Sequence, residues 1–207
     1  MQLIDLTHPI DSTTAVYPGD PPLVLVQNRW LARDHYNAYT VSSGMHVGTH
    51  VDLPLHMQDH PLTASDYPLE RFCGPGRLLR CPSQGLIAPD DSWKALKSGE
   101  IPVIYTGWDR HFGQADYFSA HPQLTEDAAQ FFIERSVGMV VLDTPSPDRN
   151  PFTVHRQLLS AGMLILENAA HLEQLLQVKR FTLMALPLRL PTEGSLVRAV
   201  AITEDEP

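Results

Sequence analysis

Residues 45–57 read M-H-V-G-T-H-V-D-L-P-L-H-M and carry the most specific pattern in the chain, with His46, His50, Asp52 and His56 close together. Imidazole nitrogens and carboxylate oxygens at this density are ligand types that suit zinc, manganese or ferrous iron. The segment contains no cysteine, which argues against a closed structural zinc site. Its intervening residues are mostly apolar, so the pattern favours a metal site over a solvated, histidine-rich loop.

The spacing of these four side chains predicts a strand and not a helix. A helix would place His46 and His50 on one face, because they are four residues apart. However, Gly48 and the β-branched residues around it disfavour a helix interior. In an extended segment the four even-numbered ligand candidates share one side, and the odd-numbered valine and leucine side chains face a core. Pro54 would end the strand pairing.

The pattern His-x-Gly-Thr-His-x-Asp-x-Pro-x-His resembles the signature of the cyclase family of metal-dependent hydrolases, which includes bacterial kynurenine formamidases and isatin hydrolases. Three further segments are similar to that family: Tyr-Pro-Gly-Asp at 17–20, Leu-Asp-Thr-Pro-Ser at 142–146 and Ala-Leu-Pro-Leu-Arg-Leu at 185–190. The resemblance therefore covers essentially the whole chain, and the histidine and aspartate motif is its most specific part.

The resemblance implies two divalent ions per chain, of zinc or manganese. It assigns His46, His50 and Asp52 as ligands, with Asp52 bridging to a second ion that His155 and Glu167 also bind. The sequence supports Glu167 independently, because this carboxylate closes the apolar run 163–166 and would be costly to bury without a cation or a partner. His155 alone would pass for a surface histidine early in a helix, so its ligand role depends on the resemblance.

Two further residues receive roles from the resemblance. His56 corresponds to the proton donor and acceptor of the reaction, and a neutral imidazole is suited to that work; orienting a metal ligand is its alternative role. Tyr17 stands where kynurenine formamidases carry tryptophan, and its ring would contact an aryl substrate or simply pack at a turn. His60 is a weaker candidate for the role of His56. The remaining histidines are interpreted as structural or surface residues: His8, His35, His111, His121 and His171.

Composition limits the classes of partner. The chain has 207 residues, 43% hydrophobic and 19% charged, which predicts one globular domain over residues 1–207. A net charge of -9 without a basic run argues against nucleic acid or an anionic membrane as a partner. The N-terminal residues show no secretory signal and no apolar run is long enough to span a bilayer, so we expect a cytoplasmic protein. Cys73 and Cys81 are expected to be reduced thiols.

Short apolar runs bounded by proline and glycine outnumber helical patterns. Strands are predicted at 3–6, 23–26, 36–42, 76–80, 102–106, 139–142, 163–166, 181–186 and 197–202. Helices are predicted at 91–97, 126–135, 153–161 and 171–177, with Thr125 as an N-cap. This is an α/β pattern with mixed sheets and few helices. It agrees with the single-domain layered β/β/α architecture, of the cyclase-like, swivelling type, that the resemblance implies.

The expected activity is hydrolysis of an amide or lactam C–N bond in a small molecule by metal-activated water, with N-formylkynurenine as one candidate substrate. The family resemblance also implies a homodimer or higher homo-oligomer. Two other functions remain open from the sequence. One is a metal-dependent cyclase or lyase acting on a small carbonyl compound. The other is a metal-containing binding protein without turnover, against which the intact His56 argues.

Overall fold

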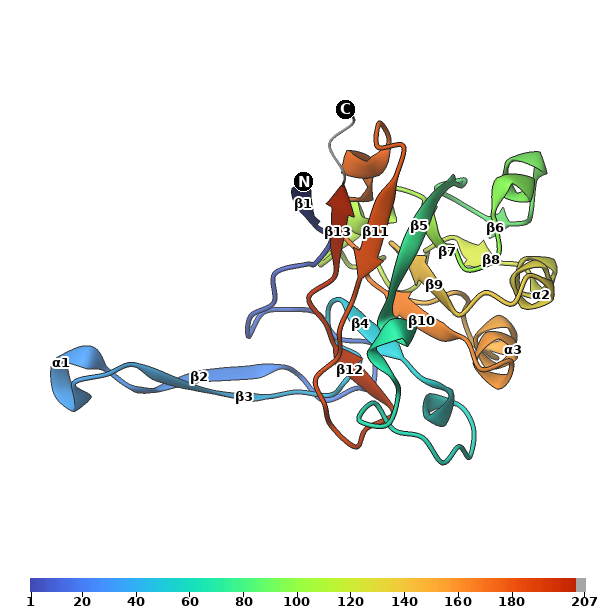
Figure 1. Cartoon of the computed structure of the whole chain (residues 1–207). Coiled ribbons are helices and arrows are strands. Elements are labelled where there is room, and N and C mark those ends of the chain that lie inside the picture. Colours follow the sequence, from blue (N-terminus) through green and yellow to red (C-terminus); the bar gives the residue numbers. More distant parts are fainter. Residues whose placement is uncertain (204–207) are drawn as a thin grey trace.

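The computed structural model describes residues 1–203 and is built on one mixed sheet of nine strands (Figure 1). In spatial order the strands are β1 (Gln2–Asp5), β13 (Val200–Thr203), β11 (Phe181–Met184), β5 (Cys73–Arg80), β7 (Ile101–Tyr105), β9 (Met139–Leu142), β10 (Leu164–Glu167), β4 (His50–Asp52) and β12 (Gly194–Leu196). The strands β5, β7, β9 and β10 run parallel, and the strands on both sides of them pair antiparallel.

The parallel centre of the sheet is covered on both faces. All four residues of β9 and of β10 are buried, as is typical of parallel strands with apolar layers on each side. One face packs against α2 (Glu126–Glu134) and α3 (Thr153–Ser160) through a core that includes Phe132, Leu158 and Ile165. The predicted N-cap is present, because the Thr125 hydroxyl accepts a hydrogen bond from the Ala128 amide at 3.2 Å.

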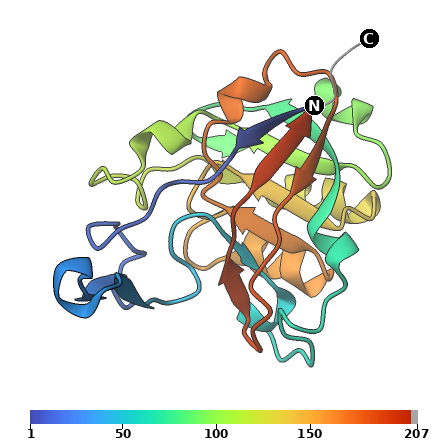
Figure 2. The same ribbon diagram turned by 60° about the vertical axis from the view of Figure 1, so that its left-hand side comes forward.

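The outer strands β1, β13 and β11 curl over the opposite face of the sheet (Figure 2). A single core cluster joins Ile4 and Ala201 from these strands to Val103, Val141 and Leu166 from the centre. The curled sheet thus supplies two β layers and the helices supply the third. This confirms the predicted layered α/β architecture.

Local differences from the prediction occur in short elements. The segments predicted as helices at 91–97 and 171–177 contain single-turn 3-10 helices, η3 (Asp91–Ala95) and η5 (Leu172–Leu175). Three other 3-10 turns are η1 (Pro54–His56), η2 (Leu69–Phe72) and η4 (Trp108–His111). The strand β4 lies within the segment that residue parity predicted as extended. The strand β12 and the two-residue pair β6 (Leu86–Ile87) and β8 (Gln123–Leu124) were not predicted, because segments this short show no periodicity.

A two-stranded ribbon extends away from this sheet. It consists of β2 (Val24–Arg29), the four-residue α1 (Leu31–Asp34) at its tip and β3 (Ala38–Ser42), and it is drawn in blue in Figure 1. We call residues 24–42 the arm. Both of its strands were predicted, whereas the tip helix was not. Within residues 1–203, no helix has the length and apolar character needed to cross a membrane.

Candidate active site

The histidine and aspartate motif passes through three local conformations. Residues 45–49 form a bend in which Gly48 has a φ of 58°, and a Cβ there would lie 2.5 Å from the Ile10 side chain. The chain is then extended in β4, as the residue parity predicted. From Pro54 the prediction of an extended segment is wrong, because proline occupies the first turn of η1 and brings His56 into a 3-10 helix.

The pairing of β4 with β10 sets two site residues side by side. His50 is the register partner of Glu167, the last residue of β10, so the carboxylate at the end of this buried strand lies beside the motif. The His50 Nε2 atom lies 3.3 Å from Asp52 Oδ1 and 3.3 Å from Glu167 Oε2. On the other edge of β4, Gly194 pairs with Asp52, and a Cβ at Gly194 would lie 2.9 Å from the Val51 carbonyl oxygen. Only glycine permits this close approach.

His155 enters the same site from α3. It is the third residue of that helix and only 3% exposed, so it is not the surface histidine that its sequence context allows. Its Nε2 atom lies 3.1 Å from Asp52 Oδ2, and its Nδ1 atom lies 3.8 Å from Glu167 Oε1. The Asp148 carboxylate accepts a hydrogen bond from the Val154 amide at 2.7 Å and thereby fixes the start of the helix.

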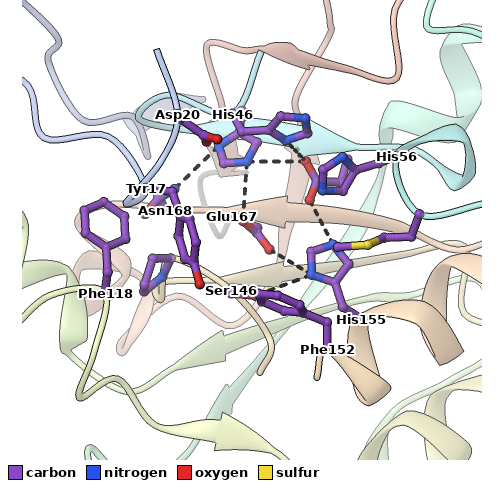
Figure 3. Close-up of a pocket in the computed structure, with 14 residues that line it drawn as sticks. Tyr17, Asp20, His46, His56, Phe118, Ser146, Phe152, His155, Glu167 and Asn168 are labelled. Atoms are coloured by element: carbon purple, nitrogen blue, oxygen red, sulfur yellow. Dashed lines mark hydrogen bonds and ion pairs between the residues drawn. The ribbon is translucent and has the colours of Figure 1, made fainter. Parts of the chain in front are cut away.

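His46 and His56 complete the cluster (Figure 3). His46 Nδ1 lies 2.7 Å from Asp52 Oδ1, and its Nε2 atom lies 3.2 Å from Glu193 Oε1. The rings of His46 and His56 are 4.0 Å apart between centroids. All five predicted ligand candidates and the predicted proton-transfer residue therefore line one cavity. Glu193 was not predicted, because nothing in its sequence neighbourhood distinguishes it from a surface glutamate.

Burial and neighbouring charges shift the pKa values of three residues in the cluster. Burial alone would lower the pKa of His50, but the nearby carboxylates of Asp52 and Glu167 outweigh it and raise that pKa to about 10. The pKa of Glu167 is raised by burial and by the charge of Asp52. His56 is different: burial lowers its pKa to about 4, so its imidazole is neutral at pH 7.

The donor atoms fit a divalent cation. The side chains of His50 and Glu167 are buried, and neither His50 Nε2 nor Glu167 Oε1 has a hydrogen-bond partner among the described residues. His50 Nδ1 lies 2.8 Å from the Gly48 carbonyl oxygen, to which it donates, so Nε2 is the atom directed at the carboxylates and would bind a cation once its proton is displaced. The contacts of His50 Nε2 and Glu167 Oε1 are ion pairs of 3.3 Å and longer. Buried polar atoms without a hydrogen bond are costly, and a cation bound between them would remove that cost.

Two overlapping sets of donors have the spacing of metal sites. One ligand atom each from His46, Asp52 and His56 lie within 4.8 Å of one another, and the same holds for His50, Asp52 and Glu167. Asp52 belongs to both sets, which is the arrangement that a bridging carboxylate needs. Imidazole and carboxylate ligands suit zinc and manganese alike.

A hydrogen-bond network that the sequence did not reveal supports the motif from behind. The Tyr117 hydroxyl donates to Asn168 Oδ1 at 2.7 Å, and Asn168 Nδ2 donates to the Gly48 carbonyl oxygen at 2.9 Å. The Thr49 hydroxyl donates to the Asn168 carbonyl oxygen at 2.6 Å. Asn168 directly follows Glu167. Two polar residues in succession after a buried apolar strand were the sequence feature that could have indicated a role for Asn168.

Aromatic side chains form one wall of the cavity, whose volume is about 220 Å³. The ring of Tyr17 makes an edge-to-face contact with Phe118 at 5.6 Å and lies 6.4 Å from the ring of Phe152. Tyr17 thus lines the cavity, and its contact with a substrate stays a prediction, whereas Phe118 and Phe152 come from loops that no pattern singled out. Other lining residues are Asp20, Met57, Pro145 and Ser146. His60 is not among them.

Comparison with known proteins places this geometry in a family. Two curated relatives are both named kynurenine formamidase. The protein from Bacillus thuringiensis (strain Al Hakam) is 28% identical over 203 residues, covering 95% of each chain. The protein from Salinibacter ruber (strain DSM 13855 / M31) is 28% identical over 219 residues, covering 100% of this chain and 99% of the relative.

Solved structures share the fold. Isatin hydrolase A from Labrenzia aggregata superposes with a TM-score of 0.87 at 24% identity, over 98% of this chain and 94% of the other. A protein described as a "potential metal-dependent hydrolase with cyclase activity" superposes with a TM-score of 0.78 at 24% identity, over 99% of both chains. The family model described as "Putative cyclase" matches residues 4–149, and the chain therefore belongs to this cyclase family.

Proposed function

We propose that this protein is a divalent-metal-dependent hydrolase that cleaves an amide or lactam C–N bond of a small aryl compound. The observation that carries the proposal is the pair of buried atoms His50 Nε2 and Glu167 Oε1, which have no hydrogen-bond partner within residues 1–203 and lie around Asp52 in an aromatic-walled cavity. The relatives named kynurenine formamidase support hydrolysis of an aryl formamide, and N-formylkynurenine is the first candidate substrate.

Five residues would hold the metal. His46, His50 and Asp52 would bind one ion, and Asp52, His155 and Glu167 would bind the second, with zinc or manganese as the ion. The bound ions would lower the pKa of water, polarise the carbonyl of the substrate and neutralise the developing oxyanion. Membership of Asp52 in both donor sets supports its bridging role. Those sets group His46 with His56 and His50 with Glu167, so the division of the other ligands between the two ions rests on the family resemblance.

His56 would transfer the proton during hydrolysis. Its imidazole is neutral at pH 7 because burial lowers its pKa to about 4, so it can accept a proton from the attacking water. The same proton can then pass to the departing nitrogen, which leaves as an amine. His56 also belongs to a donor set with His46 and Asp52, so a ligand role is the competing assignment. Metal content separates the two roles.

Substrate selection would depend on the aromatic wall. The rings of Tyr17, Phe118 and Phe152 offer edges and faces to a flat aryl group, and the Tyr17 hydroxyl adds a polar contact. A cavity of about 220 Å³ suits a small molecule and not a polypeptide.

Product analysis tests the proposal. Metal-loaded protein is incubated with N-formylkynurenine and with isatin, an aryl lactam, and the products are identified by mass spectrometry. Hydrolysis yields an amine and a carboxylate, and one oxygen atom from labelled water enters the carboxylate. Loss of water without C–N cleavage in a panel of small hydroxy-carbonyl compounds would indicate a lyase instead. Tight binding without conversion would indicate a binding protein.

We infer that the chain forms a homodimer or a higher homo-oligomer through the arm. A two-stranded ribbon is marginally stable by itself, yet the arm extends from the sheet (Figure 1). Its apolar side chains are 38–62% exposed, and a patch of this kind marks an interaction surface. These residues are Val24, Leu25, Val26, Trp30, Leu31, Tyr36, Tyr39 and Val41. A second copy of the chain, carrying the same self-complementary surface, is the proposed occupant.

Light scattering during gel filtration tests this interface. The native chain is expected to elute at a multiple of the 23.1 kDa chain mass. Val41→Lys is expected to shift it towards the monomer, because this apolar residue of β3 is 62% exposed and would lie in the interface. Leu69→Lys, which changes an equally exposed (62%) apolar residue outside the arm, is the matched control. A monomeric native chain would refute the inference.

A further inference from the structure

A second group of metal-ligand types lies outside the catalytic cavity. One ligand atom each from Asp109, His171 and Glu173 lie within 4.8 Å of one another. Asp109 belongs to η4, whereas His171 and Glu173 stand at the start of η5, in the chain segment that follows β10. None of the three lines the cavity described above. The site would therefore be distinct from the catalytic one.

Asp109 supplies a buried carboxylate without enough partners. The residue is 7% exposed, and no described residue donates a hydrogen bond to its Oδ1 atom. Its Oδ2 atom accepts one hydrogen bond, from the His171 amide at 3.0 Å. A buried carboxylate oxygen that lacks a donor is costly unless a cation is near it. In this cluster, the missing partner would be a cation.

The other two donors are reachable from solvent and partly fixed in place. The side chains of His171 and Glu173 are 49% and 42% exposed, and His171 Nδ1 lies 4.0 Å from Glu173 Oε1. His171 has a φ of 58°, a conformation that a non-glycine residue rarely adopts. The hydrogen bond from its amide to Asp109 holds that backbone. An ion from solution could thus reach all three side chains.

A further imidazole stands beside the group. His8 stacks on Phe112 with ring centroids 3.9 Å apart, and its buried Nε2 atom has no hydrogen-bond partner in the part of the chain that the structure describes. The surroundings therefore contain imidazole nitrogen and carboxylate oxygen donors, which borderline divalent metal ions prefer.

We propose that Asp109, His171 and Glu173 bind a divalent transition-metal ion, such as zinc, at a site separate from the catalytic ions. The ion would join η4 to the segment that leaves β10. The chain from η4 continues to Tyr117, which holds Asn168, and to Phe118 in the aromatic wall. Binding would stabilise this wall of the cavity. His171, interpreted as a surface residue from the sequence, thereby acquires a role.

Metal counting on the intact protein tests the proposal with zinc as the probe. The native chain and His171→Asn are saturated with zinc, freed of excess by gel filtration and analysed for zinc per chain. Asparagine tolerates the positive φ of this position, so the change removes the imidazole with little strain. The matched control is His35→Asn, because His35 is also an exposed histidine, with a φ of 65°, but belongs to the arm.

We expect His171→Asn to contain one zinc ion fewer per chain than the native protein, and His35→Asn to contain the same number. Calorimetric titration should show affinity for that ion reduced by more than the roughly 10- to 100-fold typical of losing an outer-shell partner. Glu173→Gln is a second variant, at a position without a positive φ, and it is also expected to lose one zinc ion per chain. Equal zinc content and affinity in the native protein and both variants would overturn the proposal, whatever their hydrolytic activity.

Discussion

Asp52 Oδ2 lies 3.1 Å from the Nε2 atom of His155, although 103 residues separate them in the chain. The other oxygen of the same carboxylate lies 2.7 Å from His46 Nδ1 and 3.3 Å from His50 Nε2. One aspartate therefore contacts three imidazoles, which come from the bend before β4, from β4 itself and from α3. This central position leads to the first prediction.

Asp52→Ala is expected to abolish binding of both catalytic ions, because it removes the only residue common to the two donor sets. Elemental analysis after metal loading measures this directly. Asp20→Ala is a suitable control, since Asp20 lines the cavity but belongs to neither set. Undiminished occupancy in Asp52→Ala would contradict the bridging role.

His56→Ala is expected to retain its metal and to lose turnover. Removal of a general acid–base typically slows a reaction by roughly 10²- to 10⁴-fold. Steady-state kinetics give the rate and elemental analysis gives the metal content of the same sample. A variant with native kcat would exclude proton transfer by His56. A variant that fails to bind metal would assign His56 as a ligand.

Metal affinity is expected to rise with pH. The carboxylates raise the pKa of His50 to about 10, so the metal-free site holds a proton at neutral pH that the metal must displace. Affinity should increase about tenfold per pH unit for each proton displaced. Calorimetry in buffers of different ionisation enthalpy counts the released protons. Binding without proton release would show that His50 is not a ligand.

The same raised pKa has a consequence for the metal-free fold. A histidine whose pKa is higher in the folded than in the unfolded state stabilises the fold fully below its unfolded pKa. For His50, this contribution is fully present below pH 6.5, the ordinary pKa of histidine, and it is lost as the pH rises through about 10. Denaturant unfolding of chelated protein between pH 6 and 10 should show declining stability. His50→Gln should show a smaller decline over that range.

Tyr117→Phe is expected to weaken metal binding without touching a ligand. The change removes the donor to Asn168 Oδ1, and Asn168 shares the Gly48 carbonyl oxygen with His50. Loss of such an outer partner typically reduces metal affinity by roughly 10- to 100-fold. Tyr105→Phe is the control, because that hydroxyl contacts exposed Arg110. Equal metal affinities for the two variants would show that the Tyr117–Asn168 hydrogen bond does not contribute to metal binding.

Gly76→Ala is expected to destabilise the sheet. A Cβ at Gly76, in β5, would lie 2.0 Å from the Phe181 ring on the neighbouring strand β11. Overpacking of this kind typically lowers the free energy of unfolding by about 1–3 kcal/mol. Gly44→Ala serves as the control, since its Cβ would only reach an ordinary contact of 3.7 Å with Pro21. Similar urea midpoints for the two variants would contradict the prediction.

The sequence predicted the parts of this molecule that depend on local pattern. Residue parity placed His50 and Asp52 in an extended segment, and the position of Glu167 after an apolar run placed it at the exit of a buried strand. Pro54 was read as ending the strand, but not as starting a 3-10 turn that carries His56 back towards His46.

Features that depend on tertiary contacts could not be predicted in the same way. Phe118 and Phe152 reach the cavity from loops whose course is set by the packing of distant elements. His155 stands in an ordinary amphipathic helix, and only the family resemblance distinguished it from a surface residue. Its burial became evident with the fold, because α3 packs on the sheet and turns that side chain inwards.

The central claim is that metal held by this cluster is required for hydrolysis of a C–N bond. The most direct measurement is the release of formate and kynurenine from N-formylkynurenine by metal-loaded protein, by chelated protein and by chelated protein to which metal is returned. The account predicts turnover in the first and third samples and none in the second. Equal turnover in all three samples would contradict it, and silence from fully metallated protein towards both aryl formamides and aryl lactams would contradict the proposed substrate class.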